Sequence, residues 1–318
     1  EKRETITVVP GTGSVLGVWG YSGDIYAFRN KTGGATAGMY KSTTAGWSEV
    51  DLGTVLNFNA TTINGEMVIG AILSGAGGAS GTIAGVSYNG NWDTGAQGTV
   101  VLTSVTGTFV DGEALSCPTL SFDGGIVEIS EEDTITGATS GETATVKKIQ
   151  IASGAWADDD SAGILSVTSN TGTWTDGEDI NVIGAKRAVV DGSGQPSSKT
   201  IATASGTQYA QTLQPDGTYD FVNFNFSGTD GLEKMYGANN VDNAFEFDGT
   251  TFIKIYTGMS TDTPKYVEVF KNHLFLTFPK GSLQNSSLQF PTIFSATAGA
   301  AEIVVGDEIT GLSVESKD

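Results

Sequence analysis

The chain of 318 residues contains one histidine, His273, and one cysteine, Cys117. A zinc site requires several Cys or His ligands and a disulfide requires two cysteines, so these residues alone build neither. A Ser-His or Cys-His catalytic pair would have to use His273, which lies beside Lys271 and Asn272 in a strand-like segment with no recognisable partner. Cys117 carries no nucleophile motif. We therefore assign no catalytic, cofactor-binding or metal-binding residue, and we expect no cofactor and no enzymatic activity.

Two loops resemble ligand-binding motifs only in part. The glycine-rich segment from Gly11 to Gly17 lacks the Gly-Lys-Ser/Thr of a P-loop, misses the dinucleotide-binding spacing by one residue, and precedes a strand-like segment rather than a helix. Asp158, Asp159 and Asp160 offer oxygen ligands for Ca²⁺, but the spacing of a calcium loop and its bidentate Glu are missing. The first segment therefore predicts a turn, and the second predicts a solvated loop.

An internal duplication relates the remaining candidate residues. The segment Gly-Thr-Phe-Val-Asp-Gly-Glu that ends at Glu113 matches the later segment Gly-Thr-Trp-Thr-Asp-Gly-Glu that ends at Glu178. Paired carboxylates could suggest glycoside hydrolysis, which requires two carboxyl groups about 5–10 Å apart on facing elements. A repeat instead places equivalent residues in separate modules. We therefore interpret Glu113 and Glu178 as requirements of the fold.

Aromatic residues recur in nearly the same register as the glutamates. Trp92 matches Trp156, and Phe109 matches Trp174. Exposed aromatic rings could stack on sugars, but aromatic residues also supply large buried areas in small β modules. We interpret these four residues as core residues, and we expect the two copies to share one strand order.

Turn sequences and short β-branched segments dominate the chain, and no stretch of a dozen residues has helical periodicity, so we predict an all-β fold. The 44 glycines support this prediction. Asp-Gly and Asn-Gly pairs are candidate hairpin tips. They occur at Asn64-Gly65, Asn89-Gly90, Asp111-Gly112, Asp123-Gly124, Asp176-Gly177, Asp191-Gly192, Asp216-Gly217, Asp230-Gly231 and Asp248-Gly249.

The β segments show two kinds of organisation. Residues 15–53 contain four short strands in about 40 residues, which is the period of a β-propeller blade, and the region after 215 repeats this pattern. We predict a β-propeller-like domain interrupted by two tandem small β-barrel or β-sandwich modules. The expected parts are residues 1–63, module copies at 64–125 and 126–185, and residues 186–318. The segment from Asp191 to Ser198 is expected to be a flexible return linker.

Charge excludes one class of function. The formal net charge is −20, from 16 Lys and Arg against 36 Asp and Glu. Specific DNA binding draws affinity from clustered cations, so a DNA-reading protein is not expected. No apolar run is long enough for a membrane-spanning helix. The sequence begins with Glu-Lys-Arg-Glu rather than with Met, and it stops at Glu-Ser-Lys-Asp soon after a turn-like Gly-Asp-Glu. We therefore expect it to be a processed or excerpted piece of a longer chain.

Three segments carry a family resemblance. The segment from Lys271 to Phe278 with its continuation through Gly311, the segment from Phe245 to Met259, and the segment Asp24–Arg29 with Gly46-Trp47 resemble tailed-phage virion structural proteins. Within that group, the chain resembles the propeller-bearing tail nozzle, or tubular tail protein, of short-tailed phages. The resemblance covers residues 1–60 and 215–318, and the duplicated middle lies outside it.

The resemblance implies a non-enzymatic part of the virion tail. Copies of the chain would form a cyclic ring, a hexamer, below the adaptor that joins the portal, with other tail proteins and tail fibres as possible partners. An acidic channel wall suits DNA that must slide without sticking. Two other functions stay open: a host-glycan-binding or receptor-recognition module of the tail, and a secreted polysaccharide-degrading propeller. Residues 1–63 and 186–318 provide about four to five blades, so we expect other chain segments or neighbouring subunits to complete the sheet edges.

Overall fold

The computed structural model describes residues 7–60 and 64–315. Residues 1–6 and 316–318, on which the expectation of a longer chain depends, lie outside this part. The fold is all-β, with 51% strand and 4% helix, as predicted. Among the described residues, no helix has both the length and the apolar character that a membrane crossing requires.

The chain forms two compact units. The first unit contains residues 1–55, 87–91 and 209–318, and the second contains residues 56–86 and 92–208. The boundaries differ from the expected ones. Residues 87–91 belong to the first unit, and residues 56–60 and 186–208 belong to the second unit rather than to the propeller-like part. The reason is that strands from both of these segments complete a barrel of the second unit.

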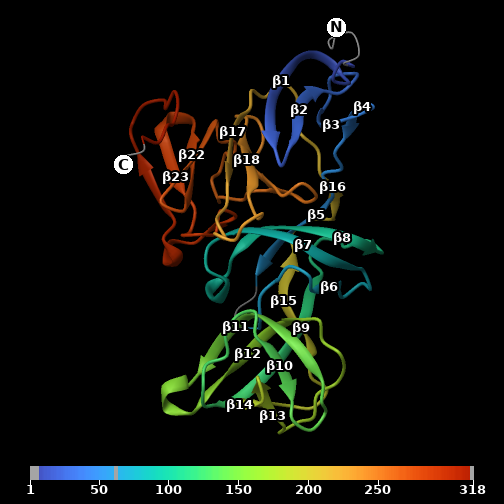
Figure 1. Cartoon of the computed structure of the whole chain (residues 1–318), viewed down its shortest axis with the longest axis vertical. Helices are drawn as coiled ribbons and strands as arrows, with labels where there is room; N and C mark the ends of the chain where they lie inside the picture. Colours follow the sequence, from blue (N-terminus) through green and yellow to red (C-terminus); the bar gives the residue numbers. More distant parts are fainter. Residues whose placement is uncertain (1–6, 61–63, 316–318) are drawn as a thin grey trace. The chain divides into compact units, whose positions relative to one another are not determined.

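Three antiparallel sheets of four strands each make up most of the first unit (Figure 1). In each sheet, the strands lie side by side in the order in which they occur in the sequence. The first sheet contains β1 (Thr12–Tyr21), β2 (Asp24–Asn30), β3 (Ala37–Thr43) and β4 (Gly46–Glu49). The second contains β17 (Asp220–Phe224), β18 (Lys234–Ala238), β19 (Phe245–Phe247) and β20 (Phe252–Lys254). The third contains β21 (Tyr266–Phe270), β22 (His273–Phe278), β23 (Ser282–Asn285) and β25 (Ala301–Val304).

The second sheet is buried on both faces. Because side chains alternate along a strand, β18 presents Met235 to one face and Tyr236 to the other. Met235 belongs to an apolar cluster with Phe28 and Met39 of the first sheet. Tyr236 belongs to a second cluster with Leu274 and other residues of the third sheet. The three sheets therefore pack face to face, in the order first, second, third.

Two short strands complete the first unit. β16 (Tyr209–Ala210) pairs antiparallel with the first residues of β5 (Thr54–Ala60). β24 (Ile293–Phe294) pairs in parallel with the end of β7 (Ser80–Asn89). Asn89 donates hydrogen bonds to the carbonyl oxygens of Thr257 and Phe294, which fix this strand end to the connections around the third sheet.

Six strands close into a barrel in the second unit, which we call the inserted barrel (Figure 1). Its strand order is β10, β11, β12, β9, β14, β13, and β13 pairs with β10. The core contains Phe122, Leu165, Trp174 and Ile180. The strands are β9 (Ala114–Gly125), β10 (Thr134–Gly137), β11 (Thr143–Ser153), β12 (Ser161–Thr168), β13 (Asp179–Val182) and β14 (Ala185–Val190).

A second ring of six strands, which we call the first barrel, shares β9 with the inserted barrel. Its order is β6, β7, β8, β5, β15, β9, and β9 pairs with β6. The first half of β9 pairs with β6 and β15, whereas its second half pairs with β12 and β14. The additional strands are β6 (Ile72–Gly75), β8 (Gln97–Thr106) and β15 (Ser197–Ala204). The inserted barrel thus lies in the sequence between two paired strands of the first barrel.

The two barrels have the same strand order, which confirms the expected duplication. Strands β6, β7, β8 and β9 of the first barrel correspond to β10, β11, β12 and β13 of the inserted one, and β5 and β15 correspond to β9 and β14. Ring pairs agree with this correspondence. The centroids of Phe58 and Trp92 are 5.3 Å apart, and those of the matching pair, Phe122 and Trp156, are also 5.3 Å apart.

Several expectations about turns are wrong. Asp111-Gly112 and Asp176-Gly177 are turns but not hairpin tips, because the strands that they connect, β8 with β9 and β12 with β13, do not pair. Asp123-Gly124 is not a hairpin tip but lies within β9, because a Gly with positive φ, 52° here, fits a distorted strand as well as a turn. The segment from Asp191 to Ser198 is not a free linker. Asp191 donates its backbone N–H to the carbonyl oxygen of Ser121, and Gln195 is buried and forms a bridge with Trp174.

Candidate functional site

The repeated glutamates hold turns inside their own barrels. Glu113 accepts hydrogen bonds from the backbone N–H groups of Val110 and Gly77, at 2.7 and 2.9 Å. Glu178 accepts hydrogen bonds from Thr175, Thr139 and Ser140, at 2.6, 2.8 and 2.8 Å. Each carboxylate therefore fastens the turn before it to the loop that follows β6 or β10. These contacts are consistent with the interpretation of both residues as requirements of the fold, which stays a prediction.

The environment of Glu178 favours its ionised form. Burial opposes ionisation, but hydrogen bonds from the backbone of Ser140 and Thr175 and from the Ser140 hydroxyl outweigh it, so the pKa of Glu178 lies below its ordinary value. A general acid would need the opposite shift. Glu178 therefore stays an ionised acceptor that fixes the backbone around it.

The repeated aromatic residues fill the barrel cores. Trp92, Phe109 and Trp174 are buried. Trp156 is partly buried and stacks on Phe122 with an interplanar angle of 7°. Trp174 donates its indole N–H to Asn170 at 2.9 Å, which satisfies its polar atom. The interpretation of these residues as core residues is confirmed.

His273 and Cys117 have structural surroundings. His273 follows the two-residue hairpin loop between β21 and β22, and its Nδ1 lies 2.6 Å from the carbonyl oxygen of Ser286. Its other ring neighbours are the Asn285 amide and the edge of Phe275. Cys117 is fully buried in β9, and burial raises the pKa of its thiol to about 12. Neither side chain faces a second catalytic group.

The two segments that partly resemble ligand-binding motifs form a turn at the start of β1 and a loop after β11. Gly11 and Gly13 adopt positive φ at the start of β1, and Arg29 donates hydrogen bonds to the carbonyl oxygen of Gly13. Asp160 accepts a hydrogen bond from the backbone N–H of Ala155 at 2.9 Å and closes its own loop. Across residues 7–60 and 64–315, no three His, Cys, Asp or Glu side chains gather as a metal site would require.

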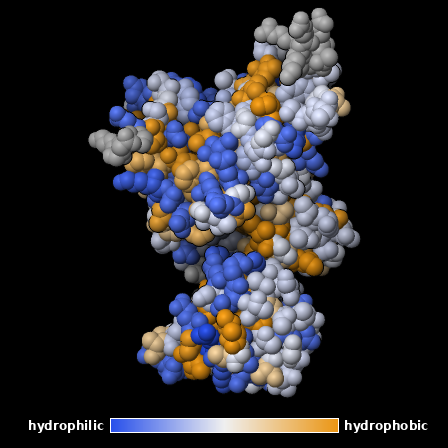
Figure 2. Space-filling view, viewed as in Figure 1, coloured by the Kyte–Doolittle hydropathy of each residue, from blue (hydrophilic) through white to orange (hydrophobic). Residues whose placement is uncertain are grey.

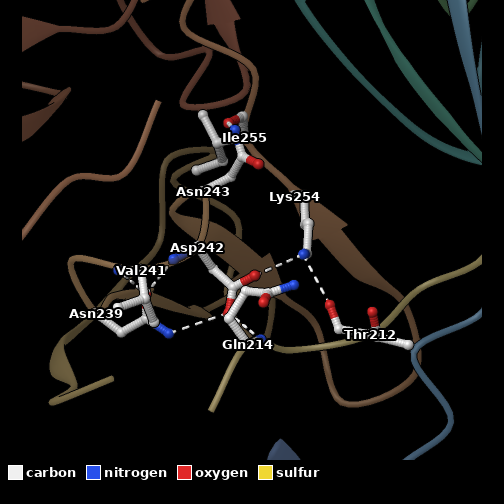
Figure 3. A network of polar contacts seen from close by, with 8 residues as sticks. All are labelled: Thr212, Gln214, Asn239, Val241, Asp242, Asn243, Lys254 and Ile255. Atoms are coloured by element: carbon white, nitrogen blue, oxygen red, sulfur yellow. Dashed lines mark hydrogen bonds and ion pairs between the residues drawn. The ribbon is translucent and has the colours of Figure 1, made fainter. Parts of the chain in front are cut away.

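Sequence reasoning missed a buried ion pair in the second sheet. Lys254 of β20 donates to Asp242 Oδ1 and to the carbonyl oxygen of Thr212, both at 2.8 Å (Figure 3). The second oxygen of Asp242 accepts from the backbone N–H of Gln214 and from the Asn239 side chain. The Asp242 side chain is only 4% exposed. The network fastens the connection before β19 to β20 and to residues 212–214.

A second buried carboxylate lies between the second and third sheets. Glu246 of β19 accepts hydrogen bonds from Lys234 at 2.6 Å and from the Tyr236 hydroxyl at 2.9 Å. Burial, followed by the charge of Glu246, raises the pKa of Tyr236 far above its ordinary value, so the hydroxyl remains a donor. An acid between Phe245 and Phe247 in a strand that is otherwise aromatic was the sequence signal for this group.

Asp262 is a third buried carboxyl group. It accepts hydrogen bonds from the backbone N–H and the hydroxyl of Thr257, both at 2.8 Å. Burial raises the pKa of Asp262 to about 6, because these hydrogen bonds only partly compensate for the lost hydration. Asp262 fixes the connection that leads from the second sheet to the third. It has no neighbouring acid or base among the described residues that would make it a catalytic pair.

Besides a hollow of about 230 Å³ that is lined by residues including Lys265, Thr277 and Glu308, two more lie beside the third sheet. One has a volume of about 260 Å³ and is lined by polar groups that include Asn89, Gln284 and Glu302. The other has a volume of about 340 Å³ and is mainly apolar, between the rings of Phe270 and Phe275 and the segment 312–315. Together with the outer sheet faces, these hollows are the candidate binding surfaces of the first unit.

The outer faces of the first and third sheets carry exposed apolar residues. On the third sheet, Leu283 lies opposite Ile303, and Ile303 is more than half exposed. On the first sheet, Val18 lies opposite Ala27, and both Val18 and Ile25 are exposed. In the view of Figure 2, hydrophobic residues also reach the surface of the inserted barrel, among hydrophilic ones.

No family model matches the chain, and neither a curated protein nor a solved structure does.

Proposed function

We propose that the chain is a non-enzymatic structural protein of a phage tail, a nozzle or tail-tube ring below the portal adaptor, which forms a channel for genome ejection. The single observation that carries this proposal is the face-to-face packing of three four-stranded sheets. Their first strands are neighbours, since β17 contacts both β1 and β21. Propeller blades pack in this way around their axis.

The exposed faces of the first and third sheets support an assembled state. Propellers have about four to eight blades, and three sheets leave two outer faces without a neighbour. Exposed apolar residues on these faces, including Val18 and Ile303, would be covered by further protein. Copies arranged in a cyclic ring, a hexamer in the tail nozzle that the sequence resembles, would supply such protein.

Net charge supports a channel through which DNA passes without binding. At −20, the chain repels phosphate groups, so a ring of such chains would favour sliding over adhesion. The fold gives no reason for one ring size, so the number of copies is an outcome of the test.

The proposal is tested on the virion and on the purified chain. Immunoelectron microscopy of particles of the encoding virus, with antibodies to this chain, should label the tail below the portal, and mass photometry should show a closed oligomer. Absence of the chain from purified particles would overturn the proposal. So would turnover of a capsular polysaccharide that is abolished when one carboxylate is changed to its amide.

The alternative function, a host-glycan-binding or receptor-recognition module, is favoured by the hollow of about 260 Å³, which polar and apolar side chains line together. Amides of Asn89 and Gln284 and the carboxylate of Glu302 line it, and such groups hydrogen-bond sugar hydroxyls. A glycan-array screen with the chain and with the Gln284→Leu variant decides this point. Binding that the variant loses would support the alternative, and no binding above the background would exclude it.

A further inference from the structure

The hairpin tip between β13 and β14 presents an isoleucine to solvent. Val182 lies opposite Ala185, so Ile183 and Gly184 form a two-residue loop, with φ of 49° and 74°. Ile183 is 98% exposed. Hairpin loops of this kind require positive φ at both central residues, and therefore favour Asn or Gly at the first position.

Ile183 is an exception within the chain itself. The two-residue loops of β1–β2 and β21–β22 carry Ser22 and Lys271 at the same position. Every other non-glycine residue with positive φ in the described segments is polar or charged. A β-branched residue is strained in this conformation, and an apolar side chain gains nothing from exposure to water. Neither folding nor solubility explains Ile183, whereas contact with a partner does.

The segments around Ile183 carry further exposed apolar residues and two basic residues. The exposed residues Ile126 and Val127 both direct their backbone N–H groups to the carbonyl oxygen of Arg187. Lys186 and Arg187 follow the tip on β14. Lys186 pairs with Asp179, whereas the buried Nε atom of Arg187 has no hydrogen-bond partner. A complementary surface would therefore combine an apolar recess with an acidic rim.

The hollow on the third sheet has these properties. Its volume of about 340 Å³ exceeds that of an isoleucine side chain, and its lining includes the apolar residues Phe270, Phe275, Leu312 and Val314. Phe270 and Val314 are nearly half exposed. Glu268 and Glu315 also line it, which provides the acidic groups. An apolar protrusion with Arg187 nearby and an apolar recess lined by Glu268 and Glu315 are complementary in hydropathy and in the sign of the neighbouring charges.

We propose that Ile183 of one copy of the chain inserts into the hollow between Phe270, Phe275 and Val314 of a second copy. The contact is heterologous, since a different surface of each copy takes part. Such contacts generate rings when their rotation closes and open chains when it does not. This inference deepens the proposed assembly and rests on it.

Sedimentation velocity over a range of concentrations tests the contact with the full chain. Ile183→Asn removes the apolar tip and gives the loop a residue that tolerates positive φ. Val314→Asn makes the hollow polar at nearly constant side-chain volume. Each variant should associate about 10- to 100-fold more weakly than the original chain, the range expected for loss of one buried aliphatic side chain. Ile183→Leu keeps the apolar surface and should associate as the original chain does.

Mixing the two asparagine variants gives the sharper result. One variant retains the hollow and the other retains Ile183, so an equimolar mixture should form dimers that grow no further. An original chain that assembles while Ile183→Asn assembles equally well would overturn the contact and leave the proposed ring standing. A chain that stays monomeric at all concentrations would overturn both. The unfolding temperature of Ile183→Asn is the control. If it is no lower than that of the original chain, a loss of association is not a loss of fold.

Discussion

A Cβ atom on Gly137 would lie 2.7 Å from Oε2 of Glu178, so this glycine leaves the space that the buried carboxylate occupies. The first barrel repeats the relationship, since a Cβ on Gly75 would lie 2.6 Å from Oε2 of Glu113. Neither glycine needs positive φ. Each barrel therefore contains a glycine on one strand and a glutamate after a later turn. The carboxylate of the glutamate occupies the space that a side chain at the glycine position would fill.

We predict that Gly137→Ala destabilises the inserted barrel by about 1–3 kcal/mol, because the Ser140 hydroxyl and the Glu178 carboxylate must both move and leave backbone N–H groups without their acceptor. Urea unfolding followed by tryptophan fluorescence measures the change. Gly20→Ala is the matched control, since a Cβ there finds its nearest neighbour at 3.8 Å. An unchanged unfolding midpoint for Gly137→Ala would show that the carboxylate does not support the turn.

Glu178 should make the stability of the barrel depend on acid. Its pKa is lowered in the fold, so below an unfolded-state value of about 4.3 the unfolded chain binds more protons than the folded one. The free energy of unfolding should therefore fall as the pH falls through this range. Glu178→Gln should flatten this part of the profile, whereas Glu128→Gln, at an exposed position, should not. Parallel profiles for all three proteins would contradict the prediction.

Asp262 should have the opposite effect. Its pKa is about 6 in the fold, whereas an unfolded chain gives about 3.9, so between these values the folded chain binds more protons. The free energy of unfolding should fall as the pH rises from about 4 to about 6. We expect Asp262→Asn to lose this contribution and the exposed Asp230→Asn to keep it. The difference between the pH profiles of unfolding of these two variants measures the contribution of Asp262. If the two profiles do not differ, the carboxyl group of Asp262 is in contact with water rather than buried.

The ion pair of Asp242 and Lys254 gives a fourth prediction. Lys254→Met should destabilise the first unit by about 3 kcal/mol, because Asp242 would be left buried and charged without its cation. Adding Asp242→Asn should restore part of the loss. Lys31→Met, which removes an exposed pair with Glu49, should change the stability by less than about 1 kcal/mol. Thermal unfolding of the four proteins compares them, and equal losses for both lysines would show that burial does not matter here.

Sequence alone predicted the strands and the duplication because both leave local patterns. Alternating residues around Tyr26 and Phe28, and the repeated Asp-Gly-Glu segment, mark strands and turns directly. The sharing of β9 left no such pattern, because both halves of that strand are equally β-like and pairing depends on residues up to 89 positions away, as for Ala114 and Thr203. Domain boundaries were misplaced for this reason.

The candidate surfaces were less predictable than the fold. Nothing near Asp242 in the sequence identifies Lys254 as its partner, since the pairing results from the packing of a loop against β20. Similarly, Ile183 resembles any strand residue until the register of β13 and β14 places it in a hairpin tip. Conversely, Glu113 and Glu178 could be assigned a structural role because repetition revealed what the fold itself demands.

The sharing of β9 also sets an order of events during synthesis. All strands of the inserted barrel have left the ribosome once Val190 has emerged, whereas the first barrel still lacks β15 and the first unit lacks everything after Gln208. Domains fold as units as their residues become available. The inserted barrel is therefore the first of these bodies that can become compact, and β1 to β4 wait for the later sheets that complete their unit.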